Sequence, residues 1–503
     1  MFKSLIAKVK AVMQKMGLIK SIKSVSDIQA LPVDDGFYEL IETVWLPLYQ
    51  GYLAKYKDEP FHEVEYMTIE GGKQNRRMHT LGMPKIVSKE MASLIFNEKC
   101  KINISDESLS EVIEDVFKYN KFYKLFQDRL EHMFALGGLA IKAYIETDRT
   151  KQKKIKIGYA TADCFIPLTY SNDDITEGVF LNVTRKGDKW YTRLEWHTWD
   201  GPKYIIENQL FESDKSSQMG VKIPLGTLYP GLEKRIEFKG LSRPLFIYIK
   251  PNIANNVDLQ SPLGISLYAN AIDTIKALDT AFDSYHREFK LGKKRIIVPH
   301  TAVRTIVDRE TEEVHRYFDA NDEVYEAFNF EDLDKQQIVD NSIELRVEEH
   351  IKAIQSLLDI LALQTGFSPG AFSFDGQGVK TATEVVSENS KTYQTKNSHE
   401  NVIEEGIINL VISICELAKL FNVFKVPEKY EVTVDFDDSI AEDRDANATY
   451  YLKLRNGGLI PKYMALMRIL KVPEEQAKQI IQEAQEEAAT DLPDVDQLYS
   501  GGA

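Results

Sequence analysis

Hydrophobic residues recur at helical spacing along residues 265–289. Successive apolar positions lie three or four residues apart, which places them on one helix face: Ile265, Tyr268, Ile272, Ile275, Leu278, Phe282, Tyr285 and Phe289. The spacing predicts a helix from Ile265 to Leu291, ended by Gly292. Its opposite face has mixed charge, and we expect such a face either to be solvated or to contact a neighbouring copy of the chain. The charged residues of that face are Asp273, Lys276, Asp283 and Arg287.

Two further long helices are predicted downstream. Apolar residues on one face of residues 343–361 indicate the second helix, which is capped by Gly366. The third is expected at about residues 381–421, with Gly406 as a position where it can bend. Residues 387–400, in the middle of this helix, are almost all polar, so we expect them to face solvent, a channel or another subunit.

Short runs of β-branched and aromatic residues predict strands in two regions. Runs between residues 138 and 208 alternate with turn signals and indicate an antiparallel sheet, and residues 293–331 are predicted to form a small β unit between the first two helices. Trp190, Trp196 and Trp199 lie in the antiparallel region. Packing within the sheet and stacking on nucleic-acid bases are the two interpretations of this tryptophan cluster.

Composition and charge restrict the class of protein. Of 503 residues, 43% are hydrophobic and 28% are charged, as in globular proteins, and no apolar run is long enough for a membrane-spanning helix. The net charge of −15 disfavours a sequence-reading duplex-DNA binder, because such proteins neutralise phosphates with a basic face. Cys100, Cys164 and Cys415 are few and scattered, as is typical of a reducing compartment. The basic residues 1–26 predict a helix that packs on its own chain, docks a partner or lies on a membrane surface.

The sequence contains no recognisable enzyme motif. The nine histidines form no HExxH and no metal-spaced cluster with cysteine, and GxSxG is absent. The loop at 376–381 resembles a phosphate cradle, but a P-loop requires glycine at the places of Phe374 and Val379. We therefore expect no catalytic residue and no cofactor.

An acidic cluster follows a strand that is predicted at residues 430–436. Its members are Asp435, Asp437, Asp438, Glu442, Asp443 and Asp445. A calcium loop counted from Asp435 would have Ile440 where glycine is required and Ala446 where a bidentate glutamate is required. No metal site is therefore predicted. A solvated or helix-capping cluster and a cation-bridged contact between subunits remain the two interpretations.

Stretches spread over most of the chain resemble bacteriophage portal proteins, the head–tail connectors of tailed phages, in the group common in long-tailed phages and prophages of Gram-positive bacteria. These stretches, in family order, are residues 76–98, 189–213, 262–298, 366–395 and 432–446. The most telling are GFSPGAFSFDGQGVKTATEVVSENSKTYQT at 366–395 and VTVDFDDSIAEDRDA at 432–446. The resemblance rests on the large share of the chain that these stretches span rather than on a catalytic motif.

The resemblance implies an α+β, portal-type fold with long stem and wing helices, a β-rich wing, a small β clip and a helical crown. Its parts would follow a basic N-terminal helix at 1–26: wing at 27–263, stem helix at 264–292, clip at 293–332, stem helix at 333–365, tunnel-loop region at 366–380, a long bent wing helix and strand at 381–440, and crown and C-terminal tail at 441–503.

The resemblance also implies a function without catalysis. The protein would form a ring, typically of twelve subunits, at one capsid vertex, and double-stranded DNA would pass through its channel during packaging and ejection without sequence specificity. Its partners would be terminase, which carries the motor ATPase, the major capsid and scaffolding proteins, and a head-completion or adaptor protein, with no membrane partner. It would occur in the host cytoplasm during assembly and in the virion afterwards.

Two sets of site residues follow from the resemblance. The tunnel loop would line the narrowest part of the channel, unless its phenylalanines simply hold it against its own subunit: Phe372, Ser373, Phe374, Asp375, Gly376, Gln377, Gly378, Val379 and Lys380. Lys293, Lys294 and Arg295 would contact acidic partner surfaces or the DNA exit at the clip. Basic residues at a helix end are also favoured by the helix dipole alone, which is the alternative for these three.

Two other functions are alternatives to the portal interpretation: a DNA-processing motor subunit and an oligomeric scaffold protein. The missing nucleotide and metal motifs weigh against the first. No heptad pattern persists long enough for coiled-coil assembly, which weighs against the second. An ATPase assay and electron microscopy of the purified protein distinguish these alternatives from a portal ring.

Overall fold

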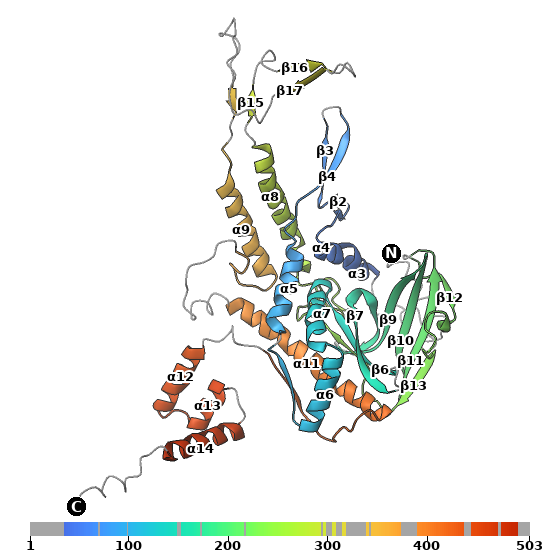
Figure 1. Ribbon diagram of the computed structural model, residues 1–503, viewed down its shortest axis with the longest axis vertical. Coiled ribbons are helices and arrows are strands. Elements are labelled where there is room, and N and C mark those ends of the chain that lie inside the picture. The colour runs from blue at the N-terminus through green and yellow to red at the C-terminus, as the bar shows by residue number, and fades with distance from the viewer. Residues whose placement is uncertain are drawn as a thin grey trace, which may run out of the picture.

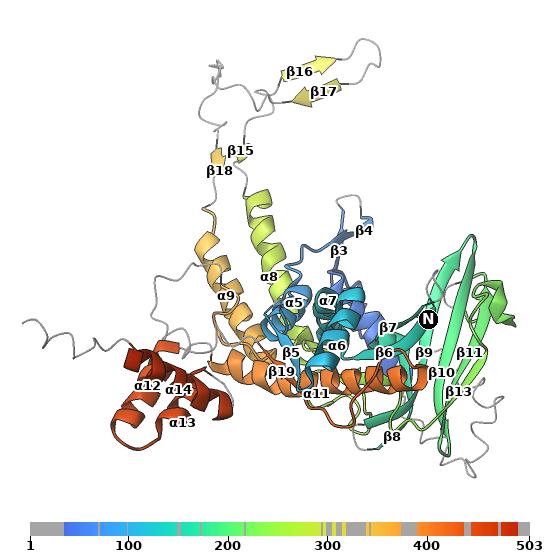
Figure 2. The ribbon, with the colours of Figure 1, turned by 60° about the horizontal axis from the view of Figure 1, so that its bottom comes forward.

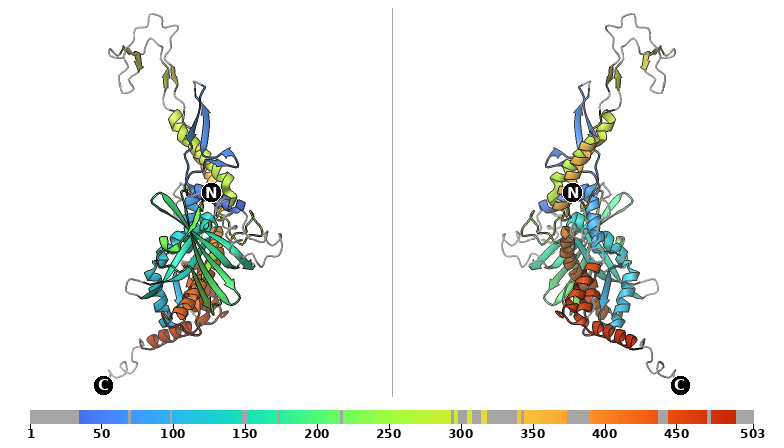
Figure 3. Two further views of the ribbon diagram at one scale, coloured as in Figure 1. Left: turned by 90° about the vertical axis from the view of Figure 1, so that its right-hand side faces the viewer. Right: turned by 90° about the vertical axis from the view of Figure 1, so that its left-hand side faces the viewer.

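The computed structural model describes residues 35–68, 71–97, 99–147, 152–171, 174–215, 218–292, 295–297, 304–307, 314–317, 339–341, 344–373, 390–436, 444–470 and 474–490. A body of helices and sheets forms the centre of the molecule, and two long helices project from it (Figure 1). Three shorter helices lie at the opposite end from the projecting pair, as Figure 3 also shows. The predicted α+β class is confirmed.

The larger sheet of the body has six antiparallel strands in the order β12-β11-β10-β9-β8, with β13 also paired to β11. The strands are β8 (Phe165–Ser171), β9 (Asp174–Lys186), β10 (Lys189–Asp200), β11 (Lys203–Ser213), β12 (Val221–Ile223) and β13 (Arg235–Lys239). All three tryptophans of the predicted cluster lie on β10. Trp196 is fully buried and Trp199 packs on Tyr204 of β11, with ring centroids 4.9 Å apart. Packing within the sheet is therefore the correct interpretation of these two tryptophans.

A smaller sheet, in the order β14-β6-β7, lies against the helices of the body. Its strands are β6 (Leu139–Thr147), β7 (Lys153–Thr161) and β14 (Phe246–Ile249). The helices are α5 (Met83–Ile95), α6 (Glu107–Tyr119), α7 (Phe122–Leu136) and the long α11 (Ser390–Phe421). Gly406 lies inside α11 where a Cβ would be 2.4 Å from the Ile249 side chain, so glycine here permits close packing of α11 on β14.

The N-terminal part of the described chain forms a short helical segment and two hairpins. The helical segment consists of α3 (Asp35–Leu40), a π-helical stretch (Ile41–Trp45) and α4 (Leu46–Tyr49). A small hairpin pairs β1 (Lys55–Tyr56) with β2 (Glu59–Pro60), and a longer one pairs β3 (Glu63–Met67) with β4 (Lys73–Arg77). The longer hairpin projects from the body in the same direction as the long helices (Figure 2).

The first projecting helix, α8, spans Ile272–Leu291 and is shorter than the predicted helix, whose start at Ile265 is wrong. Ile265 and Tyr268 are buried as the apolar pattern requires, but they precede the helix. The backbone there bonds to the body instead, since the Leu267 N–H donates to the Phe134 carbonyl at 2.8 Å. The Tyr268 hydroxyl donates to the Trp45 carbonyl at 2.8 Å. These long-range bonds fix the root of α8 to the body.

The second projecting helix, α9, spans Val347–Gln364, so the predicted start of a helix at 333 is wrong. Residues Val339–Asn341 instead form β18, which pairs antiparallel with β15 (Arg295–Ile297). The β pairing satisfies the backbone groups on the facing edges of the two strands and joins the far ends of α8 and α9. Beyond it, β16 (Arg304–Val307) pairs with β17 (Val314–Tyr317), which confirms that this region contains a β unit.

The C-terminal part begins with β19 (Val432–Asp435), which pairs with β5 (Lys101–Ile104) of the body and confirms the predicted strand. Three helices follow, α12 (Arg444–Asn456), α13 (Lys462–Leu470) and α14 (Glu474–Thr490). Most of the acidic cluster lies outside the described residues or has no described side chains. Of its members, Asp435 accepts a hydrogen bond from the Asn103 amide at 2.6 Å.

Candidate functional site: the projecting helices and the loop beside them

The two projecting helices run antiparallel and pack through apolar residues on their facing sides. Leu278 of α8 and Ile354, Leu358 and Leu361 of α9 are buried, and Tyr285 of α8 contacts the His350 ring with centroids 5.9 Å apart. Near the far end, Arg346 donates to both carboxylate oxygens of the Glu288 side chain, at 3.1 and 2.9 Å. These hydrogen bonds lower the pKa of Glu288 to about 2. The pair therefore behaves as one projecting unit that carries the β strands at its far end.

The loop after α9 is held by hydrogen bonds to the helices on both sides of it. The Gly370 N–H donates to Asp359 of α9 at 2.9 Å, and the Ser368 N–H donates to the Thr392 hydroxyl of α11 at 2.8 Å. In return, the Thr392 N–H donates to the Ser368 hydroxyl at 3.2 Å. Ser368 and Thr392 are both buried, so the first part of the loop is fixed at the place where α9 meets α11.

The structure describes only the first two residues of the predicted tunnel loop. Phe372 is half-buried and its ring lies 5.0 Å from that of the buried Phe367, while Ser373 is exposed. Residues 374–380 lie outside the described residues. Phe372 thus lies against its own subunit. For this one residue, the structure agrees with the alternative interpretation, in which the phenylalanines hold the loop there.

The predicted clip residues follow α8 directly. Arg295 is the first residue of β15 and is paired with Asn341 of β18. Its side chain is not among those described, and Lys293 and Lys294 lie outside the described residues. The contacts predicted for these three residues therefore remain a prediction.

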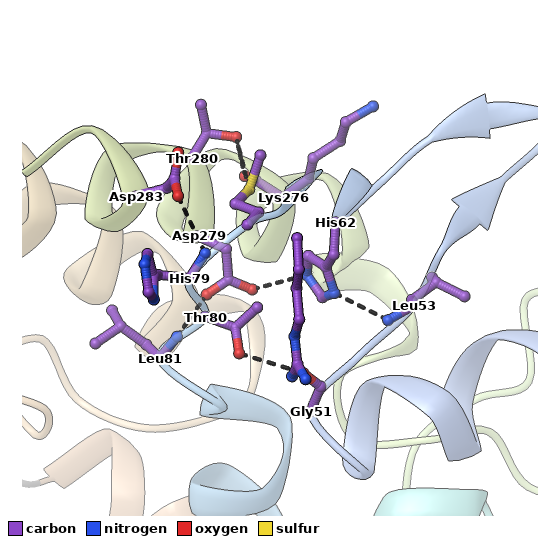
Figure 4. Close-up of polar contacts among 12 residues, drawn as sticks. Gly51, Leu53, His62, His79, Thr80, Leu81, Lys276, Asp279, Thr280 and Asp283 are labelled. Carbon is purple, nitrogen blue, oxygen red and sulfur yellow. Dashed lines mark hydrogen bonds and ion pairs between the residues drawn. The ribbon is translucent and has the colours of Figure 1, made fainter. Parts of the chain in front are cut away.

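A buried polar network joins α8 to the base of the β3–β4 hairpin (Figure 4). Asp279 accepts from the Leu81 N–H at 2.8 Å with one carboxylate oxygen and contacts His62 Nε2 at 3.1 Å with the other. The Leu53 N–H donates to His62 Nδ1 at 2.9 Å, so Nε2 carries the hydrogen and donates to Asp279. The side chains of His62 and Asp279 are only 2% and 3% exposed, which makes every one of these bonds costly to lose.

One turn further along α8, Asp283 forms a second contact with the same hairpin. Arg76 of β4 donates to both of its carboxylate oxygens, at 2.8 and 2.6 Å, and the His79 N–H adds a bond of 3.1 Å. Burial raises the pKa of Asp283, but the hydrogen bonds from Arg76 and His79 outweigh it and leave the pKa below its usual value. The expectation that Asp283 lies on a solvated or subunit-facing surface is therefore wrong. The hairpin covers it, and no local pattern of residues indicates this because Arg76 is distant in the chain.

The polar middle of the predicted third helix is only partly exposed, contrary to the expectation for residues 387–400. In α11, Thr392, Tyr393, Lys396, His399 and Glu400 are all buried. Lys396 and Glu400 form an ion pair at 2.6 Å, one turn apart. Pairing within the helix permits these charges to be buried, whereas hydropathy alone places them at the surface.

His399 fills a buried position between α11 and the body. The Asn252 N–H donates to its Nδ1 at 3.0 Å, and its ring lies 5.0 Å from that of Phe134. Burial lowers the pKa of His399 from its usual 6.5 to about 4. The neutral form is therefore the one that the fold requires.

This shift predicts a specific loss of stability in acid. Between pH 6.5 and about 4, the unfolded chain binds a proton at His399 and the folded chain does not, so stability falls as the pH falls, by about 3 kcal/mol in all. His399→Gln keeps an acceptor for Asn252 and should show a weaker fall in thermal unfolding midpoint over this range. The exposed His286→Gln should keep the wild-type pH profile, and identical profiles for all three proteins would contradict the assignment.

In the described part of the chain, no three His, Cys, Asp or Glu side chains gather as a metal site would require. None of the helices described is both long enough and apolar enough to cross a membrane.

In the described structure, a helical pair thus projects from an α+β body and carries a small β unit. Residues 46–490 match the family described as phage portal protein, SPP1 Gp6-like. The chain therefore belongs to the phage portal protein family, and the resemblance seen in the sequence is confirmed.

One solved structure, described as the neck of an empty GTA particle computed with C6 symmetry, is similar to this chain with a TM-score of 0.38 and 10% identity. The similarity covers 78% of this chain and 90% of that one. No curated protein matches the chain significantly.

Proposed function

We propose that this portal-family protein forms a homo-oligomeric ring, typically of twelve subunits, at one vertex of the capsid. Its axial channel passes double-stranded DNA without sequence specificity during packaging and ejection. The observation that carries the proposal is the family match over residues 46–490, to which the projecting α8–α9 pair adds a candidate channel wall. The ring serves as a docking platform for terminase, the major capsid and scaffolding proteins, and a head-completion or adaptor protein. It assembles in the host cytoplasm and remains in the virion.

The parts of the chain have distinct roles in this proposal. The body up to residue 263, together with α11 and β19, is the wing, and α8 and α9 are the stem. Because β15 pairs with β18, we assign residues 293–341 to the clip, beyond the boundary at 332 that the family resemblance implied. The helices α12 to α14 are the crown. Phe372 holds the start of the tunnel loop against its own subunit, and the rest of the loop, from Ser373 to Lys380, is the part proposed to reach the channel.

The net negative charge of the chain suits a channel through which DNA must slide. Each cationic contact with phosphate releases counterions and adds affinity, so about 6–10 such contacts would hold the duplex in place. A neutral or acidic wall avoids this, and the net charge of −15 is compatible with such a wall.

Electron microscopy of the purified full-length protein tests the ring directly. We expect closed rings with an axial opening, and sedimentation of a species much larger than a dimer. A protein that stays monomeric or dimeric across concentration and salt would contradict the proposal. ATP hydrolysis by the purified protein would favour the motor-subunit alternative instead.

The clip provides a further prediction. Reversing the charge of Lys293, Lys294 and Arg295 together should weaken binding of terminase or the adaptor by about tenfold or more, because rim charges steer and stabilise such contacts. Ring assembly should be unchanged. Surface plasmon resonance against each partner measures the effect, and the matched control reverses three exposed lysines of the body, Lys101, Lys118 and Lys121. Unchanged affinity at physiological salt would contradict a role of these residues in docking.

A further inference from the structure

Each of the two projecting helices has one largely exposed stripe along its length. On α9, residues 349, 353, 356, 360 and 363 follow one another at spacings of four and three, on the side away from α8. They are all exposed, and Ile360 and Leu363 retain 45% and 53% of their surface. Exposed apolar residues clustered on one helix face are a typical sign of an interaction surface.

The matching stripe on α8 lies mainly away from α9 and the hairpin, although the Thr280 hydroxyl lies 3.9 Å from the Met78 sulfur at the hairpin base. It follows the same spacing through residues 273, 277, 280, 284, 287 and 291. The α9 contact uses Leu278 and Tyr285, and the hairpin covers Asp279 and Asp283. Of the stripe itself, Arg287 is half-buried and the other residues are exposed. The helical pair thus presents one largely exposed stripe on each of its two helices.

The hydroxyl groups in both stripes are turned back onto their own helices. Thr280 donates to the Lys276 carbonyl at 2.7 Å, Ser284 to the Thr280 carbonyl at 2.8 Å, and Ser356 to the Lys352 carbonyl at 3.0 Å. Their donors are satisfied without water, so these positions offer small, nearly apolar surfaces. A partner helix can therefore pack on them without leaving a hydroxyl hydrogen unpaired.

The residues of the two stripes are complementary when those at the same height, that is, at the same position along the axis of the helical pair, are compared. The contacts Arg346–Glu288 and His350–Tyr285 fix the alignment of the antiparallel helices. At that alignment Glu349 has the height of Arg287, which is of opposite charge. Towards the body, Ser356 has the height of Thr280, and the bulky Ile360 has the height of the small Ala277.

We infer that the α9 stripe of one subunit packs on the α8 stripe of the next, with Glu349 facing Arg287, Ser356 facing Thr280 and Ile360 facing Ala277. The occupant of each stripe is thus a second copy of this chain. Two different surfaces on one unit give a head-to-tail contact, which closes into a ring when the rotation between subunits permits. Rotation about an axis roughly along the helices keeps equal heights together. The inference rests on the proposed ring and specifies which surfaces form it.

Cysteine crosslinking of the full-length protein tests the register. The double variant Ser356→Cys with Thr280→Cys should give, under mild oxidation, a ladder of covalent oligomers on a non-reducing gel. Neither single variant should give a ladder. The control pair Ser356→Cys with Glu111→Cys places the second thiol on α6, away from the stripe, and should also give none.

A second measurement uses the apolar contact. Ile360→Glu should raise the concentration for half-assembly by at least about tenfold, since a charge then replaces an apolar side chain that the next subunit would bury. Ile86→Glu, at the 40% exposed Ile86 of α5, should not. Circular dichroism should show that both variants remain folded.

The charged pair provides a reciprocal test. Glu349→Arg or Arg287→Glu alone should raise the half-assembly concentration by about fivefold, and combining them should restore much of the assembly. Rings that form without any ladder, and without response to Ile360→Glu, would overturn this interface while leaving the proposed function intact. A protein that forms no ring at all would instead contradict the proposed function itself, and this inference with it.

Discussion

Replacing both Gly376 and Gly378 by proline is expected to reduce DNA filling of procapsids by at least about tenfold while rings still form. On the proposed function, copies of this loop surround the DNA and must follow its grooves as it moves. Glycine gives the backbone the widest range of conformations, and proline fixes φ and removes a donor. The measurement is the amount of DNA protected from nuclease in a packaging reaction with terminase.

A matched variant with alanine at the same two positions separates stiffness from loss of glycine. Alanine leaves the backbone far freer than proline does, so its packaging should lie close to that of the wild type. Normal packaging by the proline variant would contradict a role of the loop in DNA movement. Failure of that variant to form rings would show that the loop acts in assembly.

Asp279→Ala is expected to destabilise the protein by about 3 kcal/mol, because it leaves the His62 ring and the Leu81 N–H without their buried acceptor. The thermal unfolding midpoint should fall by several degrees. Hydrogen exchange should also increase in residues 62–81, since this network joins the β3–β4 hairpin to α8.

Asp115→Ala is the matched control for this change. Asp115 is an exposed carboxylate on α6, so its loss should change stability by less than about 0.5 kcal/mol. Equal effects of the two substitutions would show that the buried network does not stabilise the junction. An increase in exchange over the whole chain, rather than in the hairpin, would argue against a local role.

The sequence determined the family and the faces of the projecting helices. The apolar spacing from Ile272 to Tyr285 is local information, since residues three or four apart share a helix face in any context. The same holds for the strands of the larger sheet and for Trp196, whose size and apolar character favour burial. The tunnel loop and clip residues, by contrast, came from family resemblance, and the structure describes only Phe372 and Ser373 of the loop and the backbone of Arg295.

Only the tertiary structure decided where polar residues are buried and where the helices begin. Asp283 has the pattern of a solvated residue and becomes buried because Arg76, far away in the chain, donates to both of its oxygens. Lys396 and Glu400 are buried on α11 because each neutralises the other. The start of α8 depends on a bond to Phe134, and the start of α9 depends on β18 pairing with β15. In each case, the deciding partner is supplied by folding and has no fixed spacing in the sequence, so a local pattern does not contain it.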